Sequence, residues 1–189
     1  MGNHIVYIEG NIAAGKTTVL GELEKRGYTV VREAVDEWTF FERCKKDAKR
    51  WSTTFETQVM LSMVRKIEEK VKTARKWPVF VERSIASAYV FSKVAFVNGA
   101  IEKEELDLLA DLGRALSERL NMYSSSSLYL DCSPQVCRER ITRRARKGEE
   151  GITTEYLECI EKMHGTEWTM IDATQCTEAV VEDVLRHTT

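Results

Sequence analysis

Two glycines, a lysine and a threonine lie at fixed spacing near the start of the chain, in the stretch Gly10-Asn11-Ile12-Ala13-Ala14-Gly15-Lys16-Thr17-Thr18. The first eight residues match the pattern G-x-x-x-x-G-K-[S/T], whose glycines let backbone N–H groups surround a phosphate. In such a loop the lysine reaches the β and γ phosphates, and the neighbouring hydroxyl is a ligand for Mg²⁺. An apolar run (4–8) precedes the pattern and a helical run (18–26) follows it, as the motif requires. We therefore predict that these nine residues hold ATP or GTP with Mg²⁺.

Transfer of a phosphoryl group to a hydroxyl needs further groups: a base for the hydroxyl proton, a second acidic group near the metal, and cations around the moving phosphoryl. Glu33 directly follows the apolar segment 28–32, and Glu82 and Arg83 follow the apolar segment 79–81. The carboxyl ends of parallel strands face the ligand crevice, so Glu33 is predicted as the base and Glu82 as the second Mg²⁺ group. Arg83 is predicted to orient the hydroxyl or the phosphoryl, together with the charge of Lys16. The alternatives are a solvated loop carboxylate for Glu33 and a plain helix start, capped by Ser84, for the second segment.

Positive charge is concentrated in the segment 138–146, directly before the flexible turn 147–151. Arg140 and Arg144 are four residues apart, so on a helix they share a face and could close over phosphates. We predict an Arg-rich lid over about 140–151, with a solvated basic helix as the alternative. No aromatic residue interleaves these arginines, so a nucleic-acid patch is not expected.

The elements that position these residues are short apolar runs separated by long helical patterns. Strands are expected at 4–9, 28–32, 79–82, 127–131 and 169–172, and the residues 124–127 are expected to form a polar turn. Strands with little polar alternation indicate a parallel sheet covered on both faces, which is the α/β class. Apolar residues recur at helical spacing in 51–71 and 109–120; each stripe is interpreted as a core face, with a dimer contact as the alternative.

The composition limits the partners. The 189 residues fit one domain, and 28 basic against 30 acidic residues give a net charge of -2, with no excess of positive charge for a nucleic acid. The chain shows neither a secretory signal pattern nor an apolar run approaching a membrane span. We expect no nucleic-acid partner and no membrane partner, and a cytoplasmic location, with a nuclear one possible.

Taken in order, these motifs resemble the deoxyribonucleoside kinase family, which includes cellular deoxynucleoside kinases and herpesviral thymidine kinases. The resemblance covers nearly the whole chain and rests on the phosphate loop, Glu33-Ala34-Val35 with Trp38, Arg50-Trp51 with Phe55, Glu82-Arg83-Ser84, and the lid ending in Glu149. It implies a single domain (1–189) with a three-layer P-loop kinase fold: a five-stranded parallel sheet, helices on both faces and an Arg-rich lid. It also implies a homodimer.

The resemblance further implies roles for individual residues. Glu33 is the base for the 5′-hydroxyl and Arg83 supports it, while Thr17 and Glu82 serve Mg²⁺. Arg140, Arg144 and Arg146 clamp the phosphates of ATP, and Asp172 begins a loop near adenine. By the same resemblance, Glu149 binds the sugar 3′-hydroxyl of the acceptor nucleoside. The other residues implied to contact the nucleoside are Trp38, Phe41, Phe55, Glu56, Val59, Met63 and Ala88.

The nucleobase stays open at this stage. Glu56 stands where the family usually has a glutamine, and an ionised carboxylate only accepts hydrogen bonds, which suits cytosine or guanine better than thymine. Burial could keep Glu56 protonated, so that it donates again. The apolar Val59, Met63 and Ala88 match the branch that accepts thymidine. A pyrimidine is favoured.

The sequence therefore predicts ATP-dependent phosphorylation of a deoxyribonucleoside at its 5′-hydroxyl, in nucleotide salvage, with thymidine or deoxycytidine as the favoured acceptor. One alternative is thymidylate kinase, which acts on a monophosphate, with Arg32 and Arg43 as candidate cations for the acceptor phosphate. Another is a regulatory P-loop module that binds nucleotide without turnover. A switch GTPase is disfavoured, because the chain has no N-K-x-D segment.

Overall fold

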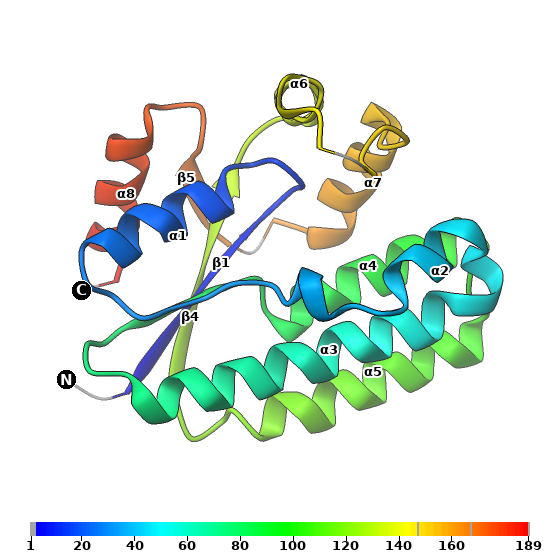
Figure 1. Ribbon diagram of the computed structural model, residues 1–189, viewed down its shortest axis with the longest axis horizontal. Helices are drawn as coiled ribbons and strands as arrows, with labels where there is room; N and C mark the ends of the chain where they lie inside the picture. Colours follow the sequence, from blue (N-terminus) through cyan, green and yellow to red (C-terminus); the bar gives the residue numbers. More distant parts are fainter. Residues whose placement is uncertain (1–2, 147, 167, 189) are drawn as a thin grey trace.

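The computed structural model describes residues 3–146, 148–166 and 168–188, and five parallel strands form its sheet (Figure 1). In chain order the strands are β1 (His4–Gly10), β2 (Val30–Val31), β3 (Val79–Glu82), β4 (Ser124–Asp131) and β5 (Thr169–Asp172). Their spatial order is β2-β3-β1-β4-β5. The first strand is therefore central, and the loop that follows it opens at the carboxyl edge of the sheet between β3 and β4, where ligands bind in open α/β sheets.

Helices cover both faces of this sheet. The helices are α1 (Lys16–Lys25), a short 3₁₀ turn η1 (Val35–Glu37), α2 (Phe41–Lys46), α3 (Ala48–Thr73), α4 (Ile85–Val97), α5 (Lys103–Glu118), α6 (Pro134–Arg144), α7 (Thr154–His164) and α8 (Thr177–Arg186). Val6 and Ile8 of β1 pack with α1, α6 and α8, whereas Ile5 packs with α3, α4 and α5. Successive strand side chains point to opposite faces, so one apolar strand supplies both core layers. The predicted three-layer α/β architecture is confirmed.

Short polar side chains fix where several helices begin. Ser84 Oγ accepts a hydrogen bond from Ser87 N at the start of α4, and Asp47 caps α3 through Arg50 N. Thr153 caps α7 through Tyr156 N. Such caps satisfy backbone N–H groups that the first helical turn leaves without partners. Because α4 starts directly after β3, the cap places Arg83 at the junction of strand and helix.

Two expected elements differ from the structure. The residues 124–127, expected as a turn, are the first half of β4 and pair with His4–Tyr7 of β1. The His4 ring lies 2.9 Å from both Ser124 Oγ and Ser126 Oγ, so the polar side chains find partners without leaving the strand. The second strand is only Val30–Val31, so Glu33 lies in the segment beyond its end.

The leucine stripe expected on the second long helix is a core face. Leu109 and Leu116 of α5, with Leu120 just beyond it, are buried in the layer shared with α3 and α4, and Leu112 packs against that layer. The first interpretation of the stripe is therefore confirmed. Among the helices formed by described residues, none is both long enough and apolar enough to cross a membrane.

Candidate active site

The loop after β1 has the backbone that the glycine pattern predicts. Gly10 has a φ of 135°, and a Cβ there would lie 2.9 Å from the backbone oxygen of Leu130, so only glycine fits. Gly15, at a φ of 112°, precedes the first residue of α1. Lys16 is 5% exposed, and its Nζ donates to the backbone oxygens of Gly10 (3.0 Å) and Asn11 (2.7 Å). The loop is thus closed by its own lysine at the N-terminus of a helix, where anions are favoured.

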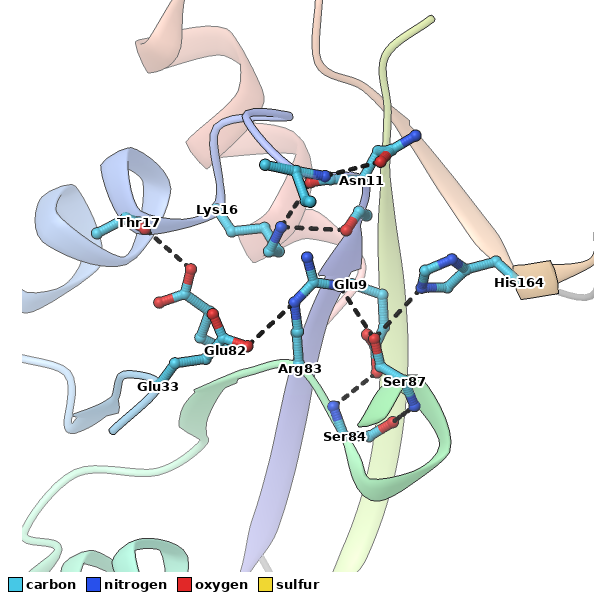
Figure 2. A network of polar contacts seen from close by, with 12 residues as sticks. Glu9, Asn11, Lys16, Thr17, Glu33, Glu82, Arg83, Ser84, Ser87 and His164 are labelled. Carbon is cyan, nitrogen blue, oxygen red and sulfur yellow. Dashed lines mark hydrogen bonds and ion pairs between the residues drawn. The ribbon is translucent and has the colours of Figure 1, made fainter. Parts of the chain in front are cut away.

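Carboxyl groups and an arginine face this loop from the ends of two neighbouring strands (Figure 2). Thr17 Oγ1 donates to Glu82 Oε1 at 2.9 Å, joining the start of α1 to the end of β3. Arg83 Nε lies 3.2 Å from Glu33 Oε1, and the two side chains are 5% and 22% exposed. The fold therefore brings together the predicted base, the predicted cation and the candidate Mg²⁺ ligands, which the sequence placed on separate segments.

The charges in this group change one another's affinity for protons. Burial raises the pKa of Glu33, and the negative charges of Glu82 and Glu9 add to the effect, while Arg83 and Lys16 oppose it. Burial and the charge of Arg83 lower the pKa of Lys16 to about 8. A carboxylate with a raised pKa is a stronger base than a solvated one, and perturbed groups of this kind gather at functional sites.

One cavity of about 1220 Å³ joins this polar group to an aromatic region. It is lined by most of the predicted site residues: Ile12, Ala13, Ala14, Gly15, Lys16, Thr17, Thr18, Glu33, Trp38, Phe41, Phe55, Glu56, Val59, Met63, Glu82, Arg83, Ala88, Arg140, Arg144, Arg146 and Glu149. Three predicted residues are not part of its lining. Gly10 and Asn11 are buried, and Asn11 Nδ2 donates to the backbone oxygen of Leu157. Asp172 instead accepts hydrogen bonds from Thr174, and its neighbour Ala173 lines the cavity.

The aromatic end of the cavity is built by η1, α2 and α3. The Trp38 ring lies 5.6 Å from Phe55 and 6.4 Å from Phe41, centroid to centroid, and Phe41 lies 5.5 Å from Phe55. Trp38 is held by a hydrogen bond from its Nε1 to Ser62 Oγ. These flat apolar faces border the same space as Val59 and Met63. The arrangement suits a planar ligand that stacks while it excludes water.

Glu56 is an exception in these apolar surroundings. It is 7% exposed and lines the cavity, and its side chain makes no hydrogen bond to any residue within the described parts of the chain. Burial raises its pKa to about 8, and the negative charge of Glu33 adds to the effect. At pH 7 the side chain is therefore mainly a neutral acid, with one O–H donor and one carbonyl acceptor.

The predicted lid forms two kinds of contact, although Lys147 lies outside the described residues. Arg140 Nη1 donates to the backbone oxygen of Ala14 (3.0 Å) and Nη2 to that of Ala173 (2.8 Å), so this arginine links the phosphate loop to the end of β5. Arg144 forms a two-pronged ion pair with Glu149, at 2.8 and 2.6 Å. The residues predicted to hold phosphate and sugar thus pair with each other.

Several residues of the site carry no sequence signal. Tyr156 of α7 and Phe91 of α4 line the cavity, and Ser87 and His164 lie behind Arg83. Each falls on a helix, where a serine, histidine or aromatic residue at a core position is ordinary. Only the three-dimensional arrangement brings Tyr156 and Phe91 to the cavity and places Ser87 and His164 next to Arg83.

Comparisons with known proteins agree with this geometry. The family model described as deoxynucleoside kinase matches residues 6–188. The chain belongs to the deoxynucleoside kinase family. The predicted family and the enzyme class, a kinase that transfers phosphate from an ATP-type donor to a nucleoside hydroxyl, are therefore confirmed.

Individual relatives of the family cover most of the chain. Deoxycytidine kinase 2 of Gallus gallus is 34% identical over 85% of this chain and 72% of the relative. Mitochondrial thymidine kinase 2 of Homo sapiens is 31% identical over 87% of this chain and 63% of the relative. A solved structure of deoxyadenosine kinase from M. mycoides with bound dCTP has a TM-score of 0.80, covers 97% of both chains and is 20% identical. The structural match confirms the predicted fold.

Proposed function

We propose that this kinase moves the γ-phosphoryl group of ATP to the 5′-hydroxyl of a deoxyribonucleoside, with Glu33 as the base. The observation that carries the proposal is the pairing of Glu33 with Arg83 in the cavity that also contains Lys16. A base must reach the acceptor hydroxyl while cations face the phosphates, and these residues lie at adjacent strand ends around one space.

In the proposed step the 5′-hydroxyl gives its proton to Glu33, and its oxygen forms a bond to the γ-phosphorus. The bond from that phosphorus to the β–γ bridging oxygen breaks, and ADP leaves. Arg83 keeps the carboxylate aligned, and Lys16 stabilises the charge on the phosphates. Because burial raises the pKa of Glu33, the carboxylate binds the incoming proton more strongly than a solvated glutamate would.

Thr17 and Glu82 are the residues that would hold Mg²⁺. They present hard oxygen donors 2.9 Å apart beside the phosphate loop, and Mg²⁺ normally takes one or two protein oxygens and completes its shell with phosphate and water. The bound ion would supply charge neutralisation on the triphosphate. The donor set of this chain fits that role.

The proposed place of the nucleobase is the aromatic end, between Trp38 and Phe55 and next to Glu56. A neutral Glu56 can donate to N3 of cytosine and accept from its exocyclic amine, or accept from N3–H of thymine and donate to a neighbouring carbonyl. The protonated form of Glu56, which the sequence left open, can therefore pair with cytosine and with thymine. Relatives named as deoxycytidine and thymidine kinases support the same choice.

The lid is proposed to exchange partners when the phosphate donor binds. Arg144 pairs with Glu149 in the structure. When ATP binds, Arg144 would turn to the phosphates, and Glu149 would become free to bind the sugar 3′-hydroxyl. Arg146 is exposed at the cavity and is proposed to join it. Charge-assisted bonds to phosphate are strong enough to compete with a partly exposed ion pair.

A homodimer is also proposed. Apolar side chains remain exposed on two adjacent helices, Phe96 and Val97 of α4 and Leu108 of α5, the last at 63%. Size-exclusion chromatography with light scattering tests the assembly, and a monomer at micromolar concentration would contradict it. The cytoplasmic or nuclear location stays a prediction.

The proposed reaction is tested with a panel of acceptors. The purified protein is incubated with Mg²⁺-ATP and, separately, thymidine, deoxycytidine, deoxyguanosine, deoxyadenosine or thymidine monophosphate, and ADP formation is measured. ADP with thymidine or deoxycytidine is expected. ADP only with the monophosphate would move the assignment to thymidylate kinase, and no ADP with any acceptor would favour a regulatory nucleotide-binding module.

A further inference from the structure

Arg83 is held in an uncommon backbone conformation. Its φ is 66°, in the left-handed region that side-chain-bearing residues rarely adopt, and the residue is buried. Such a residue is strained and persists only where its surroundings fix it. Its backbone N–H donates to the Ile8 oxygen, and its guanidinium lies 4.7 Å from the Phe91 ring centroid. The Arg83 side chain reaches Glu33 from this position. A strained backbone conformation of this kind needs further contacts to hold it.

That support comes from the first turn of α4. Arg83 Nη1 donates to Ser87 Oγ at 3.2 Å, and Ser87 is fully buried. A guanidinium only donates hydrogen bonds, so the Ser87 oxygen must accept here, and its own O–H must point elsewhere.

His164, the last residue of α7, receives that O–H. His164 Nε2 lies 3.3 Å from Ser87 Oγ, and Nδ1 lies 3.0 Å from the backbone oxygen of Ile160. A carbonyl only accepts, so Nδ1 carries the ring proton and Nε2 is a bare acceptor. Burial lowers the pKa of His164 to about 4, and the nearby charges of Arg83, Lys16 and Lys93 also disfavour the imidazolium. Figure 2 shows the two contacts, and their donors and acceptors are therefore assigned: Arg83 donates to Ser87, and Ser87 donates to His164.

The ring cannot easily turn away from this contact. The Tyr129 ring lies 5.3 Å from that of His164, edge to face, and Trp168 packs at 6.2 Å. Trp168 Nε1 also donates to the backbone oxygen of His164. A fixed ring at the end of α7 thus sets the direction of the Ser87 hydroxyl.

We propose that Ser87 and His164 are positioning residues for phosphoryl transfer: His164 orients the Ser87 hydroxyl, whose oxygen then holds the Arg83 guanidinium against Glu33. Neither residue touches the reacting atoms. The inference rests on the proposed roles of Glu33 and Arg83, and it makes α7, which follows the lid, a support of the base.

The test compares substitutions that remove the contact with substitutions that keep it. In Ser87→Ala the acceptor for Arg83 is lost, and in His164→Phe the acceptor for Ser87 is lost while the ring volume remains. We expect kcat to fall roughly 10- to 100-fold in both, because small displacements of a reacting group cost this much. Dissociation constants for ATP and for deoxycytidine should change less than about threefold.

Two controls separate positioning from mere packing. His164→Gln places an amide oxygen near the position of Nε2, so most of the wild-type kcat should return. Ser92→Ala removes another fully buried serine of α4, whose Oγ has no hydrogen-bond partner among the described residues, and should leave kcat unchanged. Thermal melting of every variant monitors folding. If the larger change at position 164 prevents folding, the kcat of Ser87→Ala still tests the inference.

A double-mutant cycle gives the decisive readout. In an Arg83→Ala background, His164→Phe should lower kcat no further, because the residue that it positions is gone. The inference would be overturned if the kcat losses of Arg83→Ala and His164→Phe multiply in the double variant. It would also be overturned if Ser87→Ala and His164→Phe both have the wild-type kcat. If Arg83→Ala and Glu33→Gln themselves leave kcat unchanged, the proposed function fails instead, so the two failures are distinguishable.

Discussion

Replacement of Glu56 by glutamine should remove a pH dependence from both the stability and the base choice of this kinase. Glu56 is buried at the aromatic end of the cavity, and its pKa is raised to about 8 by burial, with a further contribution from Glu33. Cys44 and Tyr156 also lie within its electrostatic influence. Below pH 7 the acid and the amide both present one donor and one acceptor, so wild type and variant should behave alike. Above pH 8 only the wild type becomes an anion.

The effect on stability follows from proton linkage. The folded state binds the Glu56 proton more tightly than the unfolded chain, whose pKa is about 4.5, so this contribution is fully present below pH 4.5 and is lost as the pH rises through 8. At about 1.4 kcal/mol per pKa unit, the wild type loses on the order of 3 kcal/mol between pH 5 and 7.5. A glutamine at position 56 does not titrate, so Glu56→Gln does not lose this part of the free energy of unfolding. The melting temperature of Glu56→Gln should therefore gain roughly 5 to 10 °C over wild type across that interval.

The effect on base choice follows from the same titration. With a pKa of about 8, Glu56 is about nine-tenths neutral at pH 7 and about one-tenth neutral at pH 9. The neutral acid matches cytosine, whereas the carboxylate matches the two adjacent donors of guanine. The ratio of kcat/KM for deoxycytidine to that for deoxyguanosine should fall by up to about 100-fold from pH 7 to 9 in wild type, and stay level in Glu56→Gln.

The assay offers both nucleosides to the enzyme together and measures the ratio of the two monophosphates formed at each pH. Titration of Glu33 changes both rates equally, so it cancels in this ratio. A product ratio that does not change with pH in wild type would refute the reasoning that neutral Glu56 selects the base. The same pH dependence of this ratio in Glu56→Gln would refute it as well.

Three further predictions concern the phosphate end of the site. Arg144→Ala should raise the KM for ATP roughly tenfold or more by removing the proposed phosphate contact, whereas Arg138→Ala on the same helix, outside the cavity lining, should not; steady-state kinetics compares the two. Gly10→Ala should lower the free energy of unfolding by roughly 2–3 kcal/mol, because its Cβ would meet a backbone oxygen, and Gly27→Ala, also at positive φ but in open space, should cost less in chemical denaturation. Thr17→Val should raise the Mg²⁺ concentration needed for half-maximal rate roughly tenfold while Thr17→Ser retains it, and equal requirements would remove Thr17 from the metal site.

Much of the fold could be predicted because its signals are local. The phosphate loop needs glycine where φ is positive, and five short apolar runs separated by helices leave few arrangements other than a covered parallel sheet. The sequence wrongly predicts a turn at the serines 124–127 because their strand partner, β1, is distant in the sequence. Pairing of this kind depends on tertiary contacts that a local pattern does not contain.

The candidate site could be predicted in part for a similar reason. The sequence could place Glu33, Glu82 and Arg83 close together because strand ends meet at one edge of a parallel sheet. The protonation state of Glu56 depends on how completely α3 is covered, and the pairing of Arg144 with Glu149 depends on how the lid folds back. Burial and side-chain partners of this kind exist only in the folded chain.

The central claim, that Glu33 accepts the proton of the acceptor hydroxyl, is tested most directly by the single-turnover rate of Glu33→Gln with bound Mg²⁺-ATP and deoxycytidine. We predict a rate lower by on the order of 100-fold or more, with dissociation constants for both ligands nearly those of wild type. A rate equal to that of wild type, with both ligands bound, would contradict the claim and remove Glu33 from the chemistry.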